Sequence, residues 1–377
     1  MKLLNLQIFQ FSYHKMKRER KKILLFIFAI FILCTVSAEN IFDSYKGKVY
    51  CNSKKSIQLE LIEKIDSYQS ESGTEEFSPK IVTLSSKNNQ IIFFNRFDHK
   101  IIVFNLDTFT NESKPLKIIQ KTKGKGPNEL IYPIDLFYDD NRDRLYIADL
   151  KNFCIYIYDN EFNEIKRIKL DFRPYRLFLS LNYLNITLYD STIDFCTQRI
   201  DLNYDKLIDG LFEPSKKGSL LEKKYRNMLF TINTNEKESK FFVTRNYPDF
   251  TIYSIKSGNI EKAFCNTALL KKKLPKPKYK IIENDKKTWG IMAFSDLAYS
   301  PSKKLLFTLT THGWAELAEK KGLNRYICIF DENGNTLCEY KILPYNGAED
   351  SLIFDEKNLI IYYATYDSIW KLKIKKE

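Results

Sequence analysis

The chain contains few of the residues that metal centres and hydrolytic active sites usually require. Its 377 residues include only 3 histidines, and His14 lies close to the N-terminus, so His99 and His312 alone cannot form a multi-histidine metal site. No C-x-x-C pair is present among the 7 cysteines, which argues against a zinc site and a dense disulfide framework. The motifs G-x-S-x-G and H-E-x-x-H and an EF-hand calcium loop are also missing. The sequence therefore assigns no cofactor, no metal and no catalytic residue.

Cysteine usage leaves one disulfide undecided. Cys154 and Cys328 lie in apolar runs that are typical of core strands. Cys328 and Cys338 flank the turn "DENGN", and they face each other for one loop length but not for a loop one residue longer or shorter.

The N-terminal segment has the features of a secretory signal peptide. The basic segment Met16–Lys22 precedes the apolar run Ile23–Leu33, and small residues follow up to Ala38. This run is shorter than the roughly 20 residues that a membrane-spanning helix needs. We therefore predict that residues 1–38 form a signal peptide, with Met16 as an alternative start, and that the protein is exported to the periplasm or cell surface. An uncleaved N-terminal anchor is the alternative.

Two processing routes are open at the end of this segment. Cleavage after Ala38 is favoured, because Val36 and Ala38 are the small residues that signal peptidase requires. Lipidation at Cys34 is the alternative, but Leu33 stands where a lipid-attachment site has a small residue. The membrane is therefore expected to be contacted only through the leader or through a lipid on Cys34.

Export also changes the charge of the protein. The whole chain has a formal net charge of +13, but the leader holds seven of the 60 basic and one of the 47 acidic residues, which leaves +7. Nucleic-acid binding needs a dense basic stripe with interleaved aromatic residues. The nearest candidate, Lys271–Lys287, contains two prolines and is typical of an exposed linker. No nucleic-acid partner is predicted.

A repeated strand pattern is the strongest signal in the chain. An apolar strand, a short polar loop and an alternating strand recur as a pair, as in "RLYIADLKNFCIYIYD" from Arg144. The first members of these pairs, which are the second strands of their units, begin near residues 91, 145, 186, 241, 305 and 359. Another apolar strand precedes each pair, and a fourth follows most of them. Four strands per unit in six units predict a six-bladed β-propeller with four-stranded antiparallel blades. A pair of β-sandwiches is the alternative.

The ends of the chain indicate how this ring closes. The last repeat stops after three strands, and the segment Ser56–Ile65 can supply the missing outer strand. We therefore predict that residues 39–377 form a single monomeric propeller domain whose ring is closed by an N-terminal strand.

The stretch "TKGKGPNELIYP" (Thr122–Pro133) superficially suggests a phosphate-binding loop. A Walker loop has G-x-x-x-x-G-K-[ST] before a helix, whereas here "IYPIDLFYDD" continues as a strand. The stretch is better interpreted as a crossover between blades. Its structural residues are those that permit or fix an unusual backbone or accept from backbone amides, namely Gly124, Gly126, Pro127 and Glu129.

This crossover and the strands that follow it carry a family resemblance. The motif G-x-G-P-x-E, followed by "RLYIADLKNFCIYIYD", resembles six-bladed propellers of the TolB-like and NHL-repeat groups, and most closely the uncharacterised exported propellers of Bacteroidetes-type bacteria. Asn128 and Leu130 depart from the Gly and Phe of that pattern. The close match covers about one blade. The resemblance implies the propeller fold and export, and it implies no reaction.

Candidate ligand-binding residues come from the loops between second and third strands, which in a propeller open on the face that commonly carries ligands. These loops offer a mixed basic and aromatic rim suited to an anionic or sugar-like ligand, and the candidates are Arg96, Lys151, Arg245, His312, Trp314 and Tyr366. His312, on the longest loop, is the strongest single candidate, with a solvated turn histidine as the alternative.

Carboxylates and amides in the same loops allow two interpretations. Asp149, Asp190, Asn95 and Asp367 converge on calcium if the protein is a lactonase-type hydrolase, or they cap their own turns by accepting from backbone amides. Capping is favoured, because the corresponding positions in two other loops are Arg245 and Thr311. The sequence therefore predicts an exported binding or scaffold propeller that recognises a protein or glycan partner through this face. A hydrolase or lyase acting at the channel mouth is the alternative.

Overall fold

The chain divides into two units, Met1–Lys48 and Val49–Glu377. The computed structural model describes residues 57–71, 73–76, 78–79, 81–126, 129–180, 182–188, 197–208, 229–235, 240–245, 247–256, 259–266, 294–312, 323–331, 336–345 and 351–376, all within the second unit. The predicted signal peptide and the linker Lys271–Lys287 lie outside the described residues. Among the residues described, no helix is long and apolar enough to cross a membrane.

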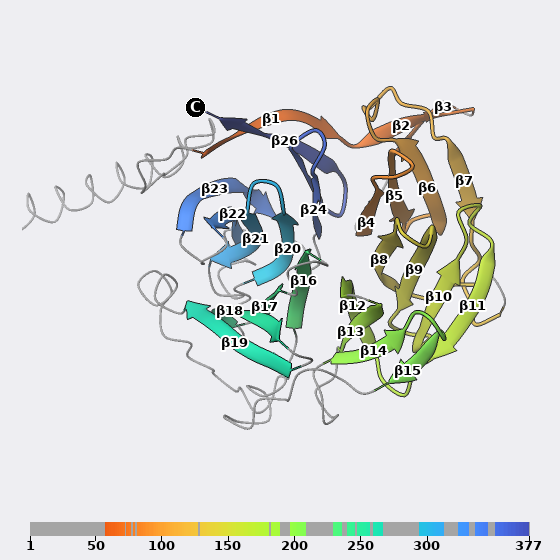
Figure 1. Cartoon of the computed structure of the whole chain (residues 1–377). Helices are drawn as coiled ribbons and strands as arrows, with labels where there is room; N and C mark the ends of the chain where they lie inside the picture. Colours follow the sequence, from red (N-terminus) through yellow and green to blue (C-terminus); the bar gives the residue numbers. More distant parts are fainter. Residues whose placement is uncertain are drawn as a thin grey trace, which may run out of the picture. The chain divides into compact units, whose positions relative to one another are not determined.

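The described residues form four-stranded antiparallel sheets whose strands follow chain order (Figure 1). The first three comprise β4 (Ile81–Ser85), β5 (Gln90–Asn95), β6 (Lys100–Asn105) and β7 (Lys117–Gln120); β8 (Pro133–Asp139), β9 (Arg144–Asp149), β10 (Cys154–Tyr158) and β11 (Glu164–Lys169); and β12 (Pro174–Ser180), β13 (Tyr183–Leu188), β14 (Thr197–Asp201) and β15 (Lys206–Ile208).

The later sheets repeat this arrangement. They comprise β16 (Leu229–Asn235), β17 (Lys240–Arg245), β18 (Tyr247–Lys256) and β19 (Asn259–Asn266); β20 (Phe294–Ser300), β21 (Leu305–His312), β22 (Leu323–Asp331) and β23 (Thr336–Tyr345); and β24 (Ser351–Asp355), β25 (Ile360–Ala364) and β26 (Ile369–Lys376) joined by β1 (Ile57–Ile65). A separate pair is formed by β2 (Ser67–Ser70) and β3 (Gly73–Glu76). The prediction of an all-β propeller with four-stranded antiparallel blades is confirmed.

The innermost strand of each sheet, which we call its first strand, is β4, β8, β12, β16, β20 or β24 (Figure 1). These strands contact one another in the cyclic order β4, β8, β12, β16, β20, β24 and back to β4. Strand β1 pairs antiparallel with β26, from Ile57 opposite Lys376 to Ile65 opposite Ile369, with a bulge between Leu61 and Glu63. An N-terminal strand is therefore hydrogen-bonded to the last strand of the chain.

Apolar clusters fill the spaces between neighbouring sheets. One cluster lies between the sheet of β4, β5 and β6 and the sheet of β8, β9 and β10. Another lies between the sheet formed by β20, β21, β22 and β23 and the sheet formed by β24, β25, β26 and β1. All five residues of β10 are buried, as expected for a strand that packs on both faces. Continuous apolar runs in the sequence therefore correspond to strands covered on both sides by adjacent blades.

Three of the described cysteines contribute to these clusters and form no disulfide. Cys154, Cys328 and Cys338 are buried and unpaired by disulfides. In the pairing of β22 with β23, Cys338 lies opposite Ile329 and Cys328 lies opposite Glu339. The two side chains therefore point to opposite faces of the sheet, and Cys328 and Cys338 do not form a disulfide.

Neighbouring sheets are also tied together through the turns after their first strands. Asp140, in the turn after β8, accepts from the Ser85 hydroxyl at 2.8 Å and from the Ser86 amide at 3.0 Å. Glu356, in the turn after β24, accepts in the same way from the Ser300 hydroxyl at 3.1 Å and the Ser302 amide at 2.9 Å. We call the side of the fold that carries these turns the turn face. The loops between second and third strands lie at the other end of the strands, on the loop face.

Candidate functional site

Two of the predicted basic residues meet on one aromatic ring of the loop face. The guanidinium carbon of Arg96 lies 4.4 Å from the centre of the Tyr132 ring, and the Lys151 ammonium lies 5.4 Å from it. Arg96 also donates to the Pro133 carbonyl at 3.0 Å and to the Tyr132 hydroxyl at 3.3 Å. Arg96 is thereby fixed, whereas Lys151 is exposed to solvent. Both cations lie against Tyr132, a residue that was not predicted from the sequence.

An exposed aromatic pair continues the same surface. Phe97 and Tyr366 contact edge to face, with ring centres 5.5 Å apart. They come from different sheets, and their exposed fractions are 61% and 45%. Phe97 directly follows Arg96, so both features form one surface, which we call the aromatic–basic rim: Arg96, Phe97, Tyr132, Lys151 and Tyr366.

The predicted turn-capping residues serve structural roles. Asp149 is fully buried and accepts from backbone amides, including those of Ile131 at 2.7 Å and Asn152 at 2.9 Å. Asn95 is also buried and accepts from the amide of Ser78 at 3.0 Å. In the ranges that the structure describes, no group of three or more His, Cys, Asp and Glu side chains could hold a metal ion.

The remaining residues that were predicted from the sequence are described only in part or lie outside the described residues. Asp367 is exposed and accepts from the Thr365 hydroxyl at 2.9 Å. His312 and Arg245 end β21 and β17, but nothing is described for their side chains. Trp314, Asp190, Pro127 and Asn128 lie outside the described residues.

Glu129 organises the crossover that precedes β8. Its carboxylate accepts from the Gly126 amide at 2.5 Å, and Arg167 of β11 donates to the Gly126 carbonyl at 2.8 Å. A Cβ on Gly124 would collide with this carboxylate, and one on Gly126 would lie 2.8 Å from it. Neither glycine has a positive φ, so glycine is required here by close approach rather than by left-handed backbone.

This close approach predicts a specific double-mutant result. Gly124→Ala should displace the Glu129 side chain and lose its charged hydrogen bond, which lowers the free energy of unfolding by about 1–2 kcal/mol. Glu129→Ala should cost a similar amount, and the double variant should cost no more than either alone, as measured by urea denaturation. Additive losses would mean that the two residues act separately.

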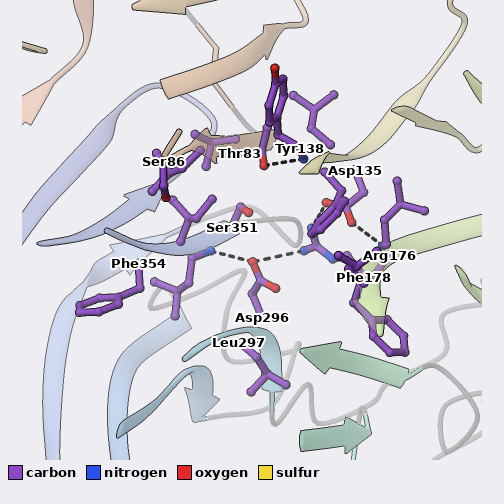
Figure 2. A pocket seen from close by; sticks show the side chains of 18 of the residues that line it. Thr83, Ser86, Asp135, Tyr138, Arg176, Phe178, Asp296, Leu297, Ser351 and Phe354 are labelled. Carbon is purple, nitrogen blue, oxygen red and sulfur yellow. Dashed lines mark hydrogen bonds and ion pairs between the residues drawn. The ribbon is translucent and has the colours of Figure 1, made fainter. Parts of the chain in front are cut away.

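A second site lies between the central strands. A cavity of about 400 Å³ is lined by side chains from β4, β8, β12, β20 and β24 (Figure 2). It extends to Ser86 and Pro301, which are exposed on the turn face. This cavity therefore opens on the face opposite to the one on which the sequence placed the ligand-binding residues.

Three charged side chains form the inner end of this cavity. Arg176 of β12 donates to the Asp135 carboxylate of β8 at 3.2 Å, and its other terminal nitrogen lies 3.9 Å from the Asp296 carboxylate of β20 (Figure 2). Each aspartate also accepts from the backbone of the next central strand, Asp135 from Leu177 and Asp296 from Leu352, both at 2.7 Å. These side chains therefore link β8, β12, β20 and β24.

Burial dominates the titration of this triad. It raises the pKa of Asp135 to about 6, an effect that the Arg176 charge and the Leu177 amide partly offset. Burial likewise raises the pKa of Asp296, and the two carboxylates together raise the pKa of Arg176 despite its burial. Two ionised carboxylates and one guanidinium would leave one excess negative charge, and the raised pKa values are consistent with that imbalance.

Comparison with solved structures identifies similar folds. A member of the DUF4221 family from Bacteroides vulgatus is 10% identical, with a TM-score of 0.52, over 86% of this chain and 100% of that one. A candidate exported protein from Bacteroides fragilis is 16% identical, with a TM-score of 0.52, over 84% of this chain and 96% of that one. At such identities the likeness shows the fold alone. No family of known proteins matches the sequence, and no curated protein is similar to it.

Proposed function

We propose that this chain is an exported β-propeller that binds a protein or glycan partner through its loop face. The observation that carries the proposal is the aromatic–basic rim, in which Phe97 and Tyr366 expose 61% and 45% of their surface beside Lys151. Exposed aromatic residues grouped with cations are typical of binding surfaces rather than of inert protein surface. The cations favour a partner that carries acidic groups.

The proposed scaffold is a single-chain six-bladed ring of the TolB-like or NHL-like type, closed by β1. The cyclic contacts of the central strands and the pairing of β1 with β26 support this arrangement. In such a ring every blade packs between two neighbouring blades. The loops are therefore held rigidly, which suits binding without a conformational change.

Export is proposed from the leader, residues 1–38, with the periplasm or the cell surface as the destination. The candidate exported protein from Bacteroides fragilis has the same fold, which agrees with this location. Lipidation at Cys34 remains the alternative to cleavage after Ala38.

Binding is favoured over catalysis because two of the four candidate calcium ligands are engaged in capping backbone amides. Asp149 and Asn95 are buried and hold backbone amides, so neither presents a free oxygen to a shared metal. A hydrolase or lyase at the channel mouth would have to rely on other groups, such as His312.

The rim can be tested by removing its two exposed rings. A Phe97→Ser/Tyr366→Ser variant should lose at least tenfold in affinity for whichever envelope protein or glycan the wild type retains on glycan arrays and in pull-downs from envelope extract. Tyr204→Ser is the matched control, because Tyr204 is 77% exposed on the turn between β14 and β15 and not on the loop face. Equal binding by the rim variant and the wild type would refute the proposal.

A further inference from the structure

We propose that the central cavity on the turn face is a second binding site, which takes a small organic cation: a primary ammonium group on a short aliphatic body. This site is separate from the aromatic–basic rim and does not depend on what the rim binds. The inference rests on three features of the cavity, namely its unbalanced charge, its walls and its opening.

The charge of the cavity favours a monovalent cation. Asp135, Asp296 and Arg176 are the charged members of its described lining. The central strand β16, which completes the cycle, has the sequence "LFTINTN" and adds no charge. Two carboxylates against one guanidinium leave room for one further positive charge, and a ligand that supplies it replaces the proton that the cluster otherwise takes up.

The two ion pairs that Arg176 forms with the aspartates are unequal in length. Arg176 contacts Asp135 at 3.2 Å but lies 3.9 Å from Asp296. Asp296 therefore has the longer ion pair with Arg176, and it also accepts hydrogen bonds from the Leu352 and Leu297 amides and from the Ser351 hydroxyl. The Ser351 hydroxyl lines the cavity and donates to Asp296, so its oxygen can accept a further hydrogen bond. An ammonium group offers three donors for these oxygens.

Other ligand classes fit this site less well. A divalent metal ion requires several oxygen ligands free of competing cations, and the Arg176 guanidinium occupies the space between the carboxylates. An anion would be repelled by the excess negative charge of the two aspartates over Arg176. An organic cation carries the required charge without demanding a complete oxygen shell.

The rest of the cavity suits an aliphatic body. Beyond the charged end, the walls include Leu84 and Leu136. They also include Phe178, Leu297 and Phe354, which are labelled in Figure 2. A volume of about 400 Å³ lies within the range of small-molecule pockets, roughly 300–1,000 Å³. The exposed residues Ser86 and Pro301 mark the entrance, so a ligand can enter from the turn face.

Isothermal titration of the full-length protein with butylammonium chloride tests the proposal. We expect saturable binding at pH 7, at least tenfold weaker binding of butanol and butyrate, and weaker binding at pH 5, where Asp135 is protonated. Asp296→Asn should weaken butylammonium binding at least tenfold. Asp201→Asn, at the end of β14 and outside the cavity, should bind as the wild type does.

A second variant covers the case in which Asp296→Asn does not fold. Ser86→Arg places a positive charge at the exposed entrance and should weaken binding of butylammonium while leaving thermal unfolding unchanged. Absence of wild-type binding, equal binding of butanol and butylammonium, or unchanged binding by Ser86→Arg would each overturn the proposal. None of these outcomes bears on the rim, which the aromatic variants test separately.

Discussion

Replacing Arg176 with leucine should lower the free energy of unfolding by about 3–5 kcal/mol at pH 8, as measured by urea denaturation. The Arg176 side chain is only 8% exposed, and the Asp135 and Asp296 side chains are 10% and 14% exposed. Removal of the guanidinium leaves two largely buried carboxylates without the cation that lies between them. Their repulsion and their unpaired burial both act against the folded state.

This loss should shrink as the pH falls. A carboxyl whose pKa is higher in the folded than in the unfolded state binds its proton more tightly when folded, so its contribution to stability falls as the pH rises. For Asp135 that window runs from its ordinary pKa of 3.8 to about 6, and loss of Arg176 would extend it upward. The difference between variant and wild type should therefore be smaller at pH 5 than at pH 8.

A matched control separates this effect from the general loss of an arginine. Arg173 is exposed and lies over the Phe153 ring at 5.6 Å, so Arg173→Leu should change stability by no more than about 0.5 kcal/mol at either pH. A loss below about 1 kcal/mol in Arg176→Leu would show that the triad does not hold the central strands together.

The strand repeat was predictable because both faces of each blade are covered. The second strands were expected to begin near residues 91, 145, 186, 241, 305 and 359, and they begin at Gln90, Arg144, Tyr183, Lys240, Leu305 and Ile360. Continuous burial makes such strands almost uniformly apolar, and polar turns separate them. The turns themselves are less visible, because the same left-handed position before the second strand is filled by Asn89, Asp143, Lys304 and Leu359.

The charged triad was not predicted, because its members are far apart in the chain. Asp135, Arg176 and Asp296 are each the third residue of a largely apolar first strand, in "PIDLFYD", "PYRLFLS" and "FSDLAYS". A charge at the same position of several first strands was the available signal, since those strands line the channel. This signal was not used, because the site residues were predicted only in the loops between second and third strands. Phe97 and Tyr132 were missed for the opposite reason, because single aromatic residues in loops carry no pattern.

Asp149→Ala should be among the most destabilising substitutions on the loop face, with a loss of about 3–5 kcal/mol in the free energy of unfolding. Asp149 is fully buried at the end of β9 and accepts from the amides of Ile131, Tyr132, Lys151 and Asn152 at 2.7 to 3.1 Å. Alanine leaves these donors without their acceptor. Asp149→Asn should also be destabilising, because its amide nitrogen would face donors.

A second aspartate provides the scale for this comparison. Asp201, at the end of β14, is only partly buried and accepts from the Asn203 amide at 2.9 Å, so Asp201→Ala should cost about 1 kcal/mol. Urea denaturation measures both losses. Equal losses for the two variants would contradict the role assigned to Asp149.

The same substitution should also weaken partner binding, although Asp149 itself is buried beneath the surface. Its carboxylate holds the amides of Tyr132 and Lys151, two members of the aromatic–basic rim. Hydrogen exchange at these amides should become faster in Asp149→Ala under native conditions, and affinity for the rim's partner should fall in parallel. If exchange accelerates and affinity does not change, Asp149 stabilises the fold without positioning the rim, and binding must depend on Phe97 and Tyr366 alone.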